Sequence, residues 1–489
     1  MTRYDFDIGI LGGGSAGLTV AAGATQAGAK TLLVDKEGRL GGDCVYYGCV
    51  PSKTLIRSAQ VYHLMKNARE FGLPEVVLQR PDYGEIAKRI QSVIRTIQKY
   101  DSEERFCKLG AKVEYGDASF VDEHAISLDG KRYSARYWVI ATGSSAAIPP
   151  LEGLKTTPYI TNREIFSLGK LPASMAVIGG GPIGIEFAQA FTRLGTKVFV
   201  VEFLGQILNA DDRDMTELVM NVLKSEGVEF YLGSAVKSTR TVGNEIEVTF
   251  QKGDETKSIR TETLLVATGR KVNLEGLGLE NIGVTLDKRG LKLDEKLRTT
   301  QKHMFGAGDV TGTYQFTHAA GYEGGIVVSN AIFHFPRKVD YTYLPWVTYT
   351  DPELASIGMN EKSAKAKGVS YSVWSEEFVN NDRSLAEGES TGKIKMLLDE
   401  KEKPIGVQIL GPQAGDLLSE WVAAMNGKVK LSTLVSAVHP YPTLAEINKR
   451  VAGNLLATKI FSEKVKKALK IFFSLRGRAC GEMADRPGE

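Results

Sequence analysis

The chain has 489 residues, of which 43% are hydrophobic and 24% charged, and this balance excludes a disordered, collagen-like or disulfide-rich protein. Its length predicts about three globular domains. Basic residues exceed acidic ones by only three, which argues against a nucleic-acid-binding protein that selects its partner by bulk charge. No apolar run reaches the roughly 18 residues of a membrane-spanning helix and no secretory signal opens the chain, so we expect a cytoplasmic protein.

A nucleotide-binding unit is predicted at the start of the chain. A buried strand over Phe6–Leu11 precedes a glycine-rich turn, a helix of small residues and a second strand that leads to Asp35. In the turn, Gly12 makes the tight bend, Gly14 lets a pyrophosphate approach the backbone, and Gly17 lets the helix pack on the strand. The acidic Asp35 can bind a ribose hydroxyl, so we expect a dinucleotide site here.

The same unit recurs in the middle of the chain. A strand over Met175–Ile178 leads into a turn with Gly179, Gly181 and Gly184, and the next strand ends at Glu202. One such glycine pattern is weak support, but two, each followed by a strand and an acid at the expected distance, are strong. Two dinucleotide sites in one chain predict a flavin and a nicotinamide that exchange hydride.

The remaining strands predict how the domains are connected. Trp138–Gly143 and Leu264–Gly269 both end in Ala-Thr-Gly, and we expect each to close one nucleotide-binding domain. Met304–Asp309 then returns the chain to the first domain. From about residue 340 the composition becomes aromatic and β-rich without a phosphate loop, which favours a packing or dimerisation role. The predicted fold class is therefore α/β, with two Rossmann-like dinucleotide-binding domains and a C-terminal α+β dimerisation domain. The expected segments are 1–150 and 271–339 for the first domain, 151–270 for the second, 340–460 for the third and 461–489 for a basic tail.

The basic tail has the pattern of a helix. Apolar residues recur at helical spacing between lysines, at Val465, Ala468, Leu469 and Phe472. We expect a C-terminal helix docked on its own protein, and a helix on a membrane surface is the less favoured alternative. A single cysteine, Cys480, follows, and the pattern assigns it no role.

The most informative stretch contains two cysteines, Cys44 and Cys49, five residues apart. No second Cys/His pair accompanies them at zinc-finger spacing, so we expect no metal site and instead a dithiol that can close a small disulfide ring. Pro51 and Ser52 predict a helix start. Cys49 would then lie near a helix N-terminus, where the dipole favours the thiolate.

With this block in place, nearly the whole chain resembles the pyridine nucleotide-disulfide oxidoreductases, the family of dihydrolipoyl dehydrogenase, glutathione reductase and mercuric reductase. The resemblance implies an FAD-dependent homodimer in which Cys49 faces the flavin as the charge-transfer thiolate and Cys44 attacks the substrate. It also implies that Lys53 lies near the flavin and pairs with Glu186. Further cofactor contacts are expected at Gly116, Thr142, Gly143, Gly269 and Asp309.

Glu202 indicates which nicotinamide is used. An acid at the end of that strand accepts a hydrogen bond from the ribose 2′-OH and repels a 2′-phosphate. The stretch around it, Val200–Phe203, lacks the arginines expected for NADP. We therefore expect NADH, with NADPH less favoured.

The C-terminal motif departs from the disulfide reductases that the chain resembles. Those enzymes place a His directly before Pro-Thr and a Glu five residues after it, and here the two positions hold Tyr441 and Glu446. A tyrosine with a pKa near 10 is a poor base at neutral pH, and mercuric reductases also have Tyr here. His439, two residues upstream, is either structural or a base in a shifted register.

Three functions follow from these features. The favoured one passes two electrons from NADH through the cysteine pair to a soft metal ion or a disulfide, as a mercuric reductase-like enzyme does. The alternative is a dihydrolipoyl dehydrogenase that oxidises dihydrolipoamide with NAD, and the third is a redox-sensing flavoprotein binding module. Asp43, Tyr46 and Tyr47 differ from the Thr and the smaller residues of the relatives, which predicts a distinct substrate pocket.

Overall fold

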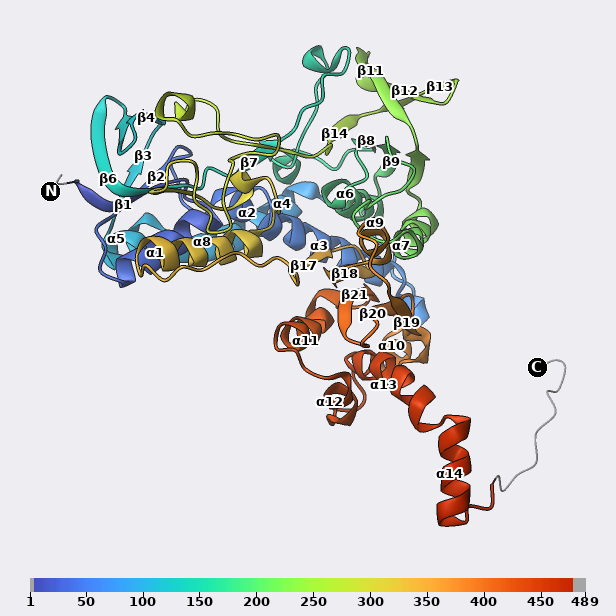
Figure 1. Cartoon of the computed structure of the whole chain (residues 1–489). Coiled ribbons are helices and arrows are strands. Elements are labelled where there is room, and N and C mark those ends of the chain that lie inside the picture. Colours follow the sequence, from blue (N-terminus) through green and yellow to red (C-terminus); the bar gives the residue numbers. More distant parts are fainter. Residues whose placement is uncertain (1–3, 478–489) are drawn as a thin grey trace. The chain divides into compact units, whose positions relative to one another are not determined.

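The computed structural model describes residues 4–477, so Cys480 lies outside the described residues (Figure 1). The chain forms two compact units with a boundary between Asp351 and Pro352, and each unit is described by itself. The first unit contains both nucleotide-binding patterns, and the second contains the β-rich C-terminal part.

The first sheet of the first unit has the strand order β3-β2-β1-β6-β5-β4, and β16 pairs with β6. Strands β1, β2, β3 and β16 run parallel to their neighbours, whereas β4 and β5 extend the sheet as an antiparallel edge. Strand β16 pairs with β6, so the chain comes back to this sheet after the second nucleotide-binding pattern. The strands are β1 (Phe6–Leu11), β2 (Thr31–Asp35), β3 (Ala111–Tyr115), β4 (Ala118–Asp122), β5 (Ala125–Leu128), β6 (Lys131–Ile140) and β16 (Met304–Gly306).

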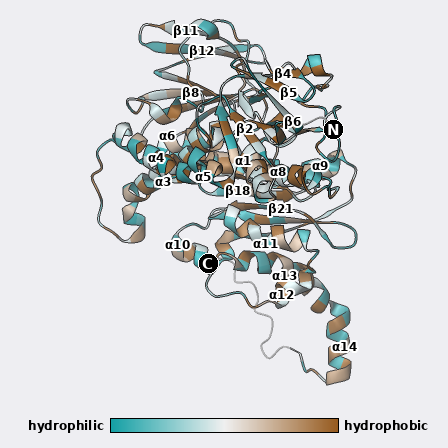
Figure 2. Cartoon of the chain, turned by 90° about the vertical axis from the view of Figure 1, so that its left-hand side faces the viewer, coloured by the Kyte–Doolittle hydropathy of each residue, from teal (hydrophilic) through white to brown (hydrophobic). Residues whose placement is uncertain are grey.

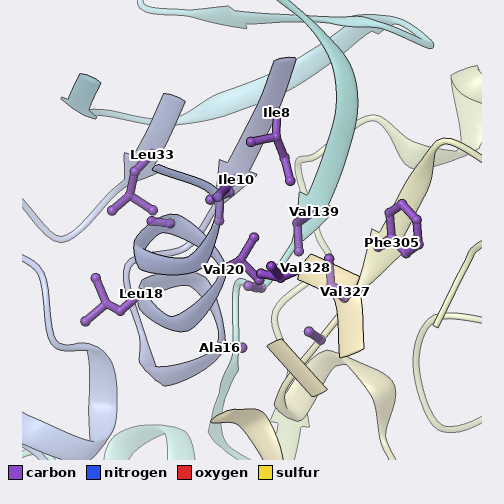
Figure 3. Close-up of a cluster of buried hydrophobic side chains, with 14 of the residues drawn as sticks. Ile8, Ile10, Ala16, Leu18, Val20, Leu33, Val139, Phe305, Val327 and Val328 are labelled. Carbon is purple, nitrogen blue, oxygen red and sulfur yellow. The ribbon is translucent and has the colours of Figure 1, made fainter. Parts of the chain in front are cut away.

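Two helices, α1 (Ser15–Gln26) and α8 (Thr317–Ala331), pack beside this sheet and against each other. Figure 3 shows aliphatic side chains of the sheet and of both helices meeting in one buried cluster. The two helices approach closely because small residues line their contact. A Cβ added at Gly23 would lie 2.9 Å from the Val328 side chain, and one at Gly324 would lie 2.9 Å from Thr19. Further helices are α2 (Gly42–Tyr46), α3 (Cys49–Lys66), α4 (Tyr83–Gln98) and α5 (Glu103–Leu109).

The second sheet repeats the arrangement of the first on a smaller scale. Its parallel strands have the order β10-β9-β8-β14, and a three-stranded antiparallel meander, β11-β12-β13, follows the strand β10 in sequence. The recurrence of the strand–turn–helix–strand unit confirms the predicted second Rossmann-like domain. The strands are β8 (Ser174–Ile178), β9 (Lys197–Glu202), β10 (Glu229–Leu232), β11 (Ala235–Val242), β12 (Glu245–Lys252), β13 (Glu255–Thr261) and β14 (Thr263–Val266), and the helices are α6 (Pro182–Arg193) and α7 (Arg213–Glu226). A short antiparallel pair, β7 (Ser144–Ala146) and β15 (Arg270–Val272), and the strand β17 (Pro345–Thr348) complete the first unit.

The second unit is built on an antiparallel sheet with the strand order β18-β21-β20-β19. Helices α11 and α13 pack on its strands, which gives the α+β layer predicted for the dimerisation domain. The strands are β18 (Glu353–Gly358), β19 (Ser372–Glu377), β20 (Lys393–Leu398) and β21 (Pro404–Gly411). The helices are α9 (Glu361–Ala366), α10 (Asp382–Glu387), α11 (Ala414–Asn426), α12 (Leu431–Ser436), α13 (Glu446–Ile460) and α14 (Glu463–Phe473).

The helix predicted in the tail is present as α14, but the expectation that it docks on its own protein is wrong for the described chain. None of its residues is buried, and Figure 1 shows it extending beyond α13. Phe472 and Phe473 expose 79% and 71% of their surface. The apolar period was sufficient to predict the helix, but it carried no information about what the apolar side contacts. Within residues 4–477, no helix has the length and apolarity required to cross a membrane.

Candidate active site

The first glycine loop has the steric features that a bound pyrophosphate requires. Gly12 has a φ of +112°, and a Cβ there would lie 2.2 Å from the carbonyl oxygen of Ala141. A Cβ on Gly17 would lie 1.9 Å from the Gly12 carbonyl oxygen, so only glycine lets α1 pack this closely. Gly14, at the start of α1, has open space instead, since a Cβ there would meet only the Cα of Gly42, at 3.8 Å. The loop therefore excludes side chains where it packs and leaves room above the helix N-terminus for a phosphate.

The second loop repeats this division of roles. Gly179 has a φ of +115°, with 2.4 Å between an added Cβ and the Ala267 carbonyl oxygen. A Cβ on Gly184 would lie 2.2 Å from the Gly179 carbonyl oxygen, whereas one on Gly181, at the start of α6, would meet nothing within 4 Å. Both loops thus fit a dinucleotide by the same geometry.

The two acids at the strand ends also occupy matching places. Asp35 accepts a hydrogen bond of 2.7 Å from the backbone N–H of Gly13, and Glu202 accepts one from the N–H of Gly180. Each carboxylate therefore lies against the middle of its glycine loop, where a ribose next to the pyrophosphate would lie. Burial raises the pKa of Asp35.

The rim of the first loop is formed by backbone from several strands. The N–H of Gly116, a residue with a φ of +142°, donates to the carbonyl oxygen of Asp35 at 3.1 Å. Thr142 and Gly143 are held by Asn273, which accepts from the Thr142 hydroxyl at 2.5 Å and donates its N–H to the Gly143 carbonyl oxygen at 3.0 Å. Gly269 lies instead beside the second loop, two residues after the Ala267 carbonyl that contacts Gly179, and with a φ of +132° it has open space where a Cβ would be.

A charged network that the sequence analysis missed links Asp309 to the cysteine segment. Arg270 donates to Asp43 Oδ2 at 2.7 Å and to Ser144 Oγ at 2.7 Å, and the Ser144 hydroxyl donates to Asp309. Burial raises the pKa of Asp309. Arg270 thus neutralises the carboxylate of Asp43. The Arg after the second Ala-Thr-Gly was visible in the sequence, but its partner was not.

The two cysteines lie in consecutive short elements. Cys44 is in α2 and is partly buried, whereas Cys49 is exposed and is the first residue of α3. The helix begins at Cys49 rather than at Pro51, so the thiol is at the N-terminus itself and not merely near it. The two cysteines are not joined by a disulfide in this structure. Thr317, at the start of α8, brings its hydroxyl to 3.4 Å from the Cys49 sulfur.

The surroundings separate the pKa values of the two thiols. A hydrogen bond from Cys44, another from Thr317 and the positive charge of Lys53 lower the pKa of Cys49 to about 6. The same contact with Cys49, together with burial, raises the pKa of Cys44. Cys49 is therefore the thiolate of the pair near neutral pH, and Cys44 carries the proton.

Lys53 lies one helical turn after Cys49 and forms the ion pair expected with Glu186. The ammonium nitrogen is 2.8 Å from Glu186 Oε2, and the Glu186 side chain is only 7% exposed. The other oxygen of Glu186 accepts from the backbone N–H of Tyr349, whose ring lies 4.3 Å from the Lys53 nitrogen. Tyr349 was not singled out in the sequence. The ion pair joins α3, which begins with Cys49, to α6, which begins at the second glycine loop.

The two tyrosines between the cysteines contact arginines. The Tyr47 hydroxyl accepts from Arg39 at 2.6 Å, and the guanidinium carbons of Arg39 and Arg163 lie 3.7 Å from the Tyr46 ring centre and 4.6 Å from the Tyr47 ring centre, respectively. Such cation–π contacts hold both aromatic side chains in place. The segment between the cysteines therefore carries two bulky aromatic side chains with arginines at its edge.

In the second unit, Tyr441 has a different partner from the one the sequence suggests. Its hydroxyl donates to Asp382 Oδ2 at 2.9 Å, and Asp382 lies at the start of α10. This hydrogen bond is the main cause that raises the pKa of Tyr441. Within the described residues, the buried Oε2 of Glu446 has no hydrogen-bond partner. The structure therefore brings Tyr441 to Asp382 and leaves one oxygen of Glu446 unpaired.

His439 is tied to the interior of the same unit. Its Nε2 lies 2.9 Å from Glu420 Oε1, and its side chain is only 10% exposed. The other oxygen of Glu420 accepts from Asn448, whose amide oxygen accepts from Trp421. This network joins α11 to α13 and holds the His439 side chain against Glu420 in its own unit.

A buried carboxyl that the sequence did not indicate supports the turn before Asp309. Glu323 of α8 is fully buried, and it accepts from the N–H of Gly308 and from the Tyr341 hydroxyl, both at 2.6 Å. Burial raises the pKa of Glu323 to about 7. The pKa of this carboxyl is thus near neutral pH, although its side chain is fully buried.

This raised pKa predicts a pH-dependent stability. Since the folded pKa exceeds the unfolded one, the contribution of Glu323 is fully present below the unfolded pKa and is lost as the pH rises through about 7. Glu323→Gln keeps an oxygen for Gly308 and an amide N–H for Tyr341, and it should reduce the fall in unfolding free energy between pH 5 and pH 8 by on the order of 3 kcal/mol. Denaturant unfolding at both pH values measures this. An unchanged pH dependence in the variant would contradict the assignment.

Two dinucleotide loops, a dithiol with one activated thiol and a lysine–glutamate pair between them define a flavin-dependent disulfide oxidoreductase. Comparison with known proteins agrees with this class. The sequence profile described as "Pyridine nucleotide-disulphide oxidoreductase" matches residues 6–324, and that of the corresponding dimerisation domain matches residues 344–452. The chain belongs to the pyridine nucleotide-disulphide oxidoreductase family.

Relatives with different substrates match at similar levels. A mercuric reductase of Staphylococcus aureus is 32% identical over 467 residues, which are 95% of this chain and 84% of the relative. A dihydrolipoyl dehydrogenase of Geobacillus stearothermophilus is 34% identical over 460 residues, which are 92% and 96% of the two chains. The Cu(II) complex of the HOCl-induced flavoprotein disulfide reductase RclA of Escherichia coli superposes with a TM-score of 0.83 at 25% identity, covering 93% of this chain and all of that one.

The comparisons confirm the class of enzyme. The chain is a flavin-dependent pyridine nucleotide-disulphide oxidoreductase that uses FAD and a pyridine nucleotide, and its dimerisation domain supports a homodimer. The relatives do not distinguish between acceptors.

Proposed function

We propose that this enzyme transfers two electrons from NADH through the Cys44–Cys49 pair to a soft metal ion or to a small disulfide, as a mercuric reductase-like enzyme of the cytoplasm. The observation that carries the redox step is the separation of the two thiol pKa values, with Cys49 at the first residue of α3. Residues Gly12, Gly14, Gly17, Asp35 and Asp309 would hold the FAD, and the loop from Gly179 to Gly184 with Glu202 would hold the nicotinamide nucleotide.

The cysteines then have separate tasks. Bound FAD supplies a two-electron relay between the nicotinamide and the disulfide. Reduction of the Cys44–Cys49 disulfide by two electrons and one proton leaves the Cys49 thiolate and the Cys44 thiol. For a disulfide acceptor, the Cys44 sulfur attacks one acceptor sulfur, which breaks the acceptor S–S bond, and the proton of Cys44 passes to the first leaving sulfur. The Cys49 sulfur then attacks the Cys44 sulfur, which restores the internal disulfide and releases the second sulfur as a thiolate that takes its proton from water.

Tyr441 favours a metal or thiol-adduct acceptor over a dithiol substrate. Oxidation of a dithiol needs a general base whose pKa lies near 7. The pKa of Tyr441 is ordinarily near 10, and the hydrogen bond to Asp382 raises it further. A phenol hydroxyl can still donate to a thiolate or lie beside a metal that thiolates hold. The family resemblance implies that the residue at this position reaches the active site of the partner subunit. We propose that Tyr441 contacts the substrate at the partner subunit's cysteine pair.

The second candidate function is that of a dihydrolipoyl dehydrogenase. It is favoured by Glu202, whose carboxylate lies against the second loop as an NAD-specific acid would. It is also favoured by the contact of His439 with Glu420, because a carboxylate beside an imidazole can orient it as a general base. The small exposed fraction of His439 weighs against that role.

Steady-state turnover with Hg(II), dihydrolipoamide plus NAD, lipoamide plus NADH, and simple disulfides separates the candidates. We expect Hg(II) or a simple disulfide to give the highest kcat/KM. Fast turnover of lipoamide and dihydrolipoamide, lost in His439→Ala, would instead identify a dihydrolipoyl dehydrogenase. Glu420→Gln, which preserves a hydrogen bond to His439, controls for loss of the local fold.

We predict a preference for NADH over NADPH. A 2′-phosphate would lie against the Glu202 carboxylate, and like charges in a partly buried site cost on the order of 1–3 kcal/mol, or about ten- to a hundredfold in kcat/KM. Glu202→Gln should reduce the discrimination without abolishing NADH turnover. Equal kcat/KM for the two nucleotides in the native enzyme would refute the role assigned to Glu202.

A further inference from the structure

We propose that α14 binds the surface of an anionic lipid bilayer and lies parallel to it, with its apolar side toward the acyl chains. The helix spans Glu463–Phe473, which corresponds to a length of about 16 Å, and none of its residues is buried. This interaction is independent of the acceptor that the cysteine pair reduces.

The apolar side of α14 is continuous. Val465, Leu469 and Phe472 follow each other at spacings of four and three residues, and the exposed Phe461 lies just before the helix, at the end of α13. Phe461 exposes 66% of its surface and Phe472 79%. Large aromatic side chains with this exposure at one face are typical of helices that insert into the headgroup–acyl boundary.

The opposite side of α14 is basic. The helix carries Lys464, Lys466, Lys467 and Lys470, and Glu463 is its one acidic residue. Figure 2 shows hydrophilic and hydrophobic segments side by side along this helix. Lysines beside an exposed apolar face are complementary in charge to the phosphate headgroups of anionic lipids. Each lysine near such a surface raises the membrane affinity severalfold.

The charge of the helix selects the bilayer over a second copy of α14. Two such helices that face each other would bring eight lysines together against two glutamates, so their charges repel. One face of an 11-residue helix also buries far less than the roughly 1,200 Å² of a stable interface. A bilayer covers the same apolar face and neutralises the lysines.

The test is co-sedimentation of the full-length, FAD-loaded protein with vesicles. An equal mixture of phosphatidylglycerol and phosphatidylcholine should retain the protein, and pure phosphatidylcholine should not. Lys464→Gln/Lys467→Gln/Lys470→Gln should weaken the binding by about a hundredfold, since each lysine near an anionic surface is worth about fivefold. Phe472→Ser should also weaken it, and added salt should release the protein.

Matched controls place the same changes elsewhere on the surface. Lys252→Gln/Lys288→Gln/Lys401→Gln removes three exposed lysines outside α14, and Phe335→Ser removes an exposed phenylalanine of similar exposure, 68%. Both controls should bind as the native protein does, and flavin content and circular dichroism report whether any variant has misfolded.

Three sedimentation results would overturn the proposal. These are no sedimentation with the anionic vesicles, equal binding to both vesicle types, and equal losses in the α14 variants and their controls. Analytical ultracentrifugation without lipid tests whether a second subunit, and not a bilayer, covers the apolar side of α14. If Phe472→Ser converts the dimer to a monomer, the apolar side of α14 belongs to a subunit contact and the proposal fails.

Discussion

Replacing Cys49 with serine should abolish the long-wavelength charge-transfer absorption of the two-electron-reduced enzyme while FAD stays bound. The band requires a thiolate against the flavin, and of the two thiols of the pair Cys49 is the one with a lowered pKa. In the native enzyme the band should fade as the pH falls through about 6, because the thiolate is protonated there. Turnover of every acceptor should fall by at least about a thousandfold, as for loss of a nucleophile that acts as part of a unit. Reductive titration followed by absorption spectroscopy measures the band.

Cys44→Ser is the matched control. It should lose acceptor turnover to the same extent but keep the Cys49 thiolate and therefore a charge-transfer band, even before reduction, since no disulfide can form. Thr317→Val should shift the pH at which the band fades upward, because it removes one hydrogen bond to the Cys49 sulfur. A band that survives in Cys49→Ser, or one that is lost in Cys44→Ser alone, would reverse the assignment of the two cysteines.

Tyr441→His should raise lipoamide turnover from a low native level. A general base contributes roughly 10²–10⁴-fold, so even a misplaced imidazole should give a visible gain. The unpaired buried oxygen of Glu446 offers an acceptor for the new ring N–H. The same change should lower Hg(II) reduction if the phenol helps to hold the metal or its thiolates. Steady-state kinetics with both acceptors measure the two effects.

Asp382→Asn separates the phenol from its present partner. The amide oxygen can still accept from the Tyr441 hydroxyl but carries no charge, so the pKa of Tyr441 should fall toward its ordinary value. His439→Ala is the second control. Fast native lipoamide turnover that collapses in His439→Ala and does not respond to Tyr441→His would contradict the mercuric reductase-like function and identify a dihydrolipoyl dehydrogenase.

The parts of the structure that could be predicted are those set by local backbone sterics. Gly17 is required by its contact with the Gly12 carbonyl oxygen in the same strand–turn–helix unit, and Gly12 by its positive φ at the turn, so their spacing alone indicated the loop. The pairing of Lys53 with Glu186, 133 residues away, could be expected only through the family resemblance.

The contacts that could not be predicted join residues distant in sequence and absent from the family motif. Arg270 meets Asp43 across 227 residues, and Tyr441 meets Asp382 across 59. Spacing does not reveal such pairs, because sheet topology and the packing of α10 determine them. The exposure of α14 could not be predicted either, since an apolar period describes a face of a helix and not what covers it.

The Lys53–Glu186 pair limits how this enzyme can be recombined with its relatives. One partner is on the helix of the charge-transfer cysteine and the other is on the helix that opens the nicotinamide loop, and Glu186 is nearly buried. A chimaera that exchanges residues 151–270 without an acid at position 186 would leave the Lys53 ammonium group unpaired beside the Cys49 thiolate. The uncompensated positive charge would lower the pKa of Cys49 further. The cysteine helix α3 and the nicotinamide-binding domain must therefore be exchanged together. A change of nucleotide specificity is better made at Glu202 than by exchange of the domain.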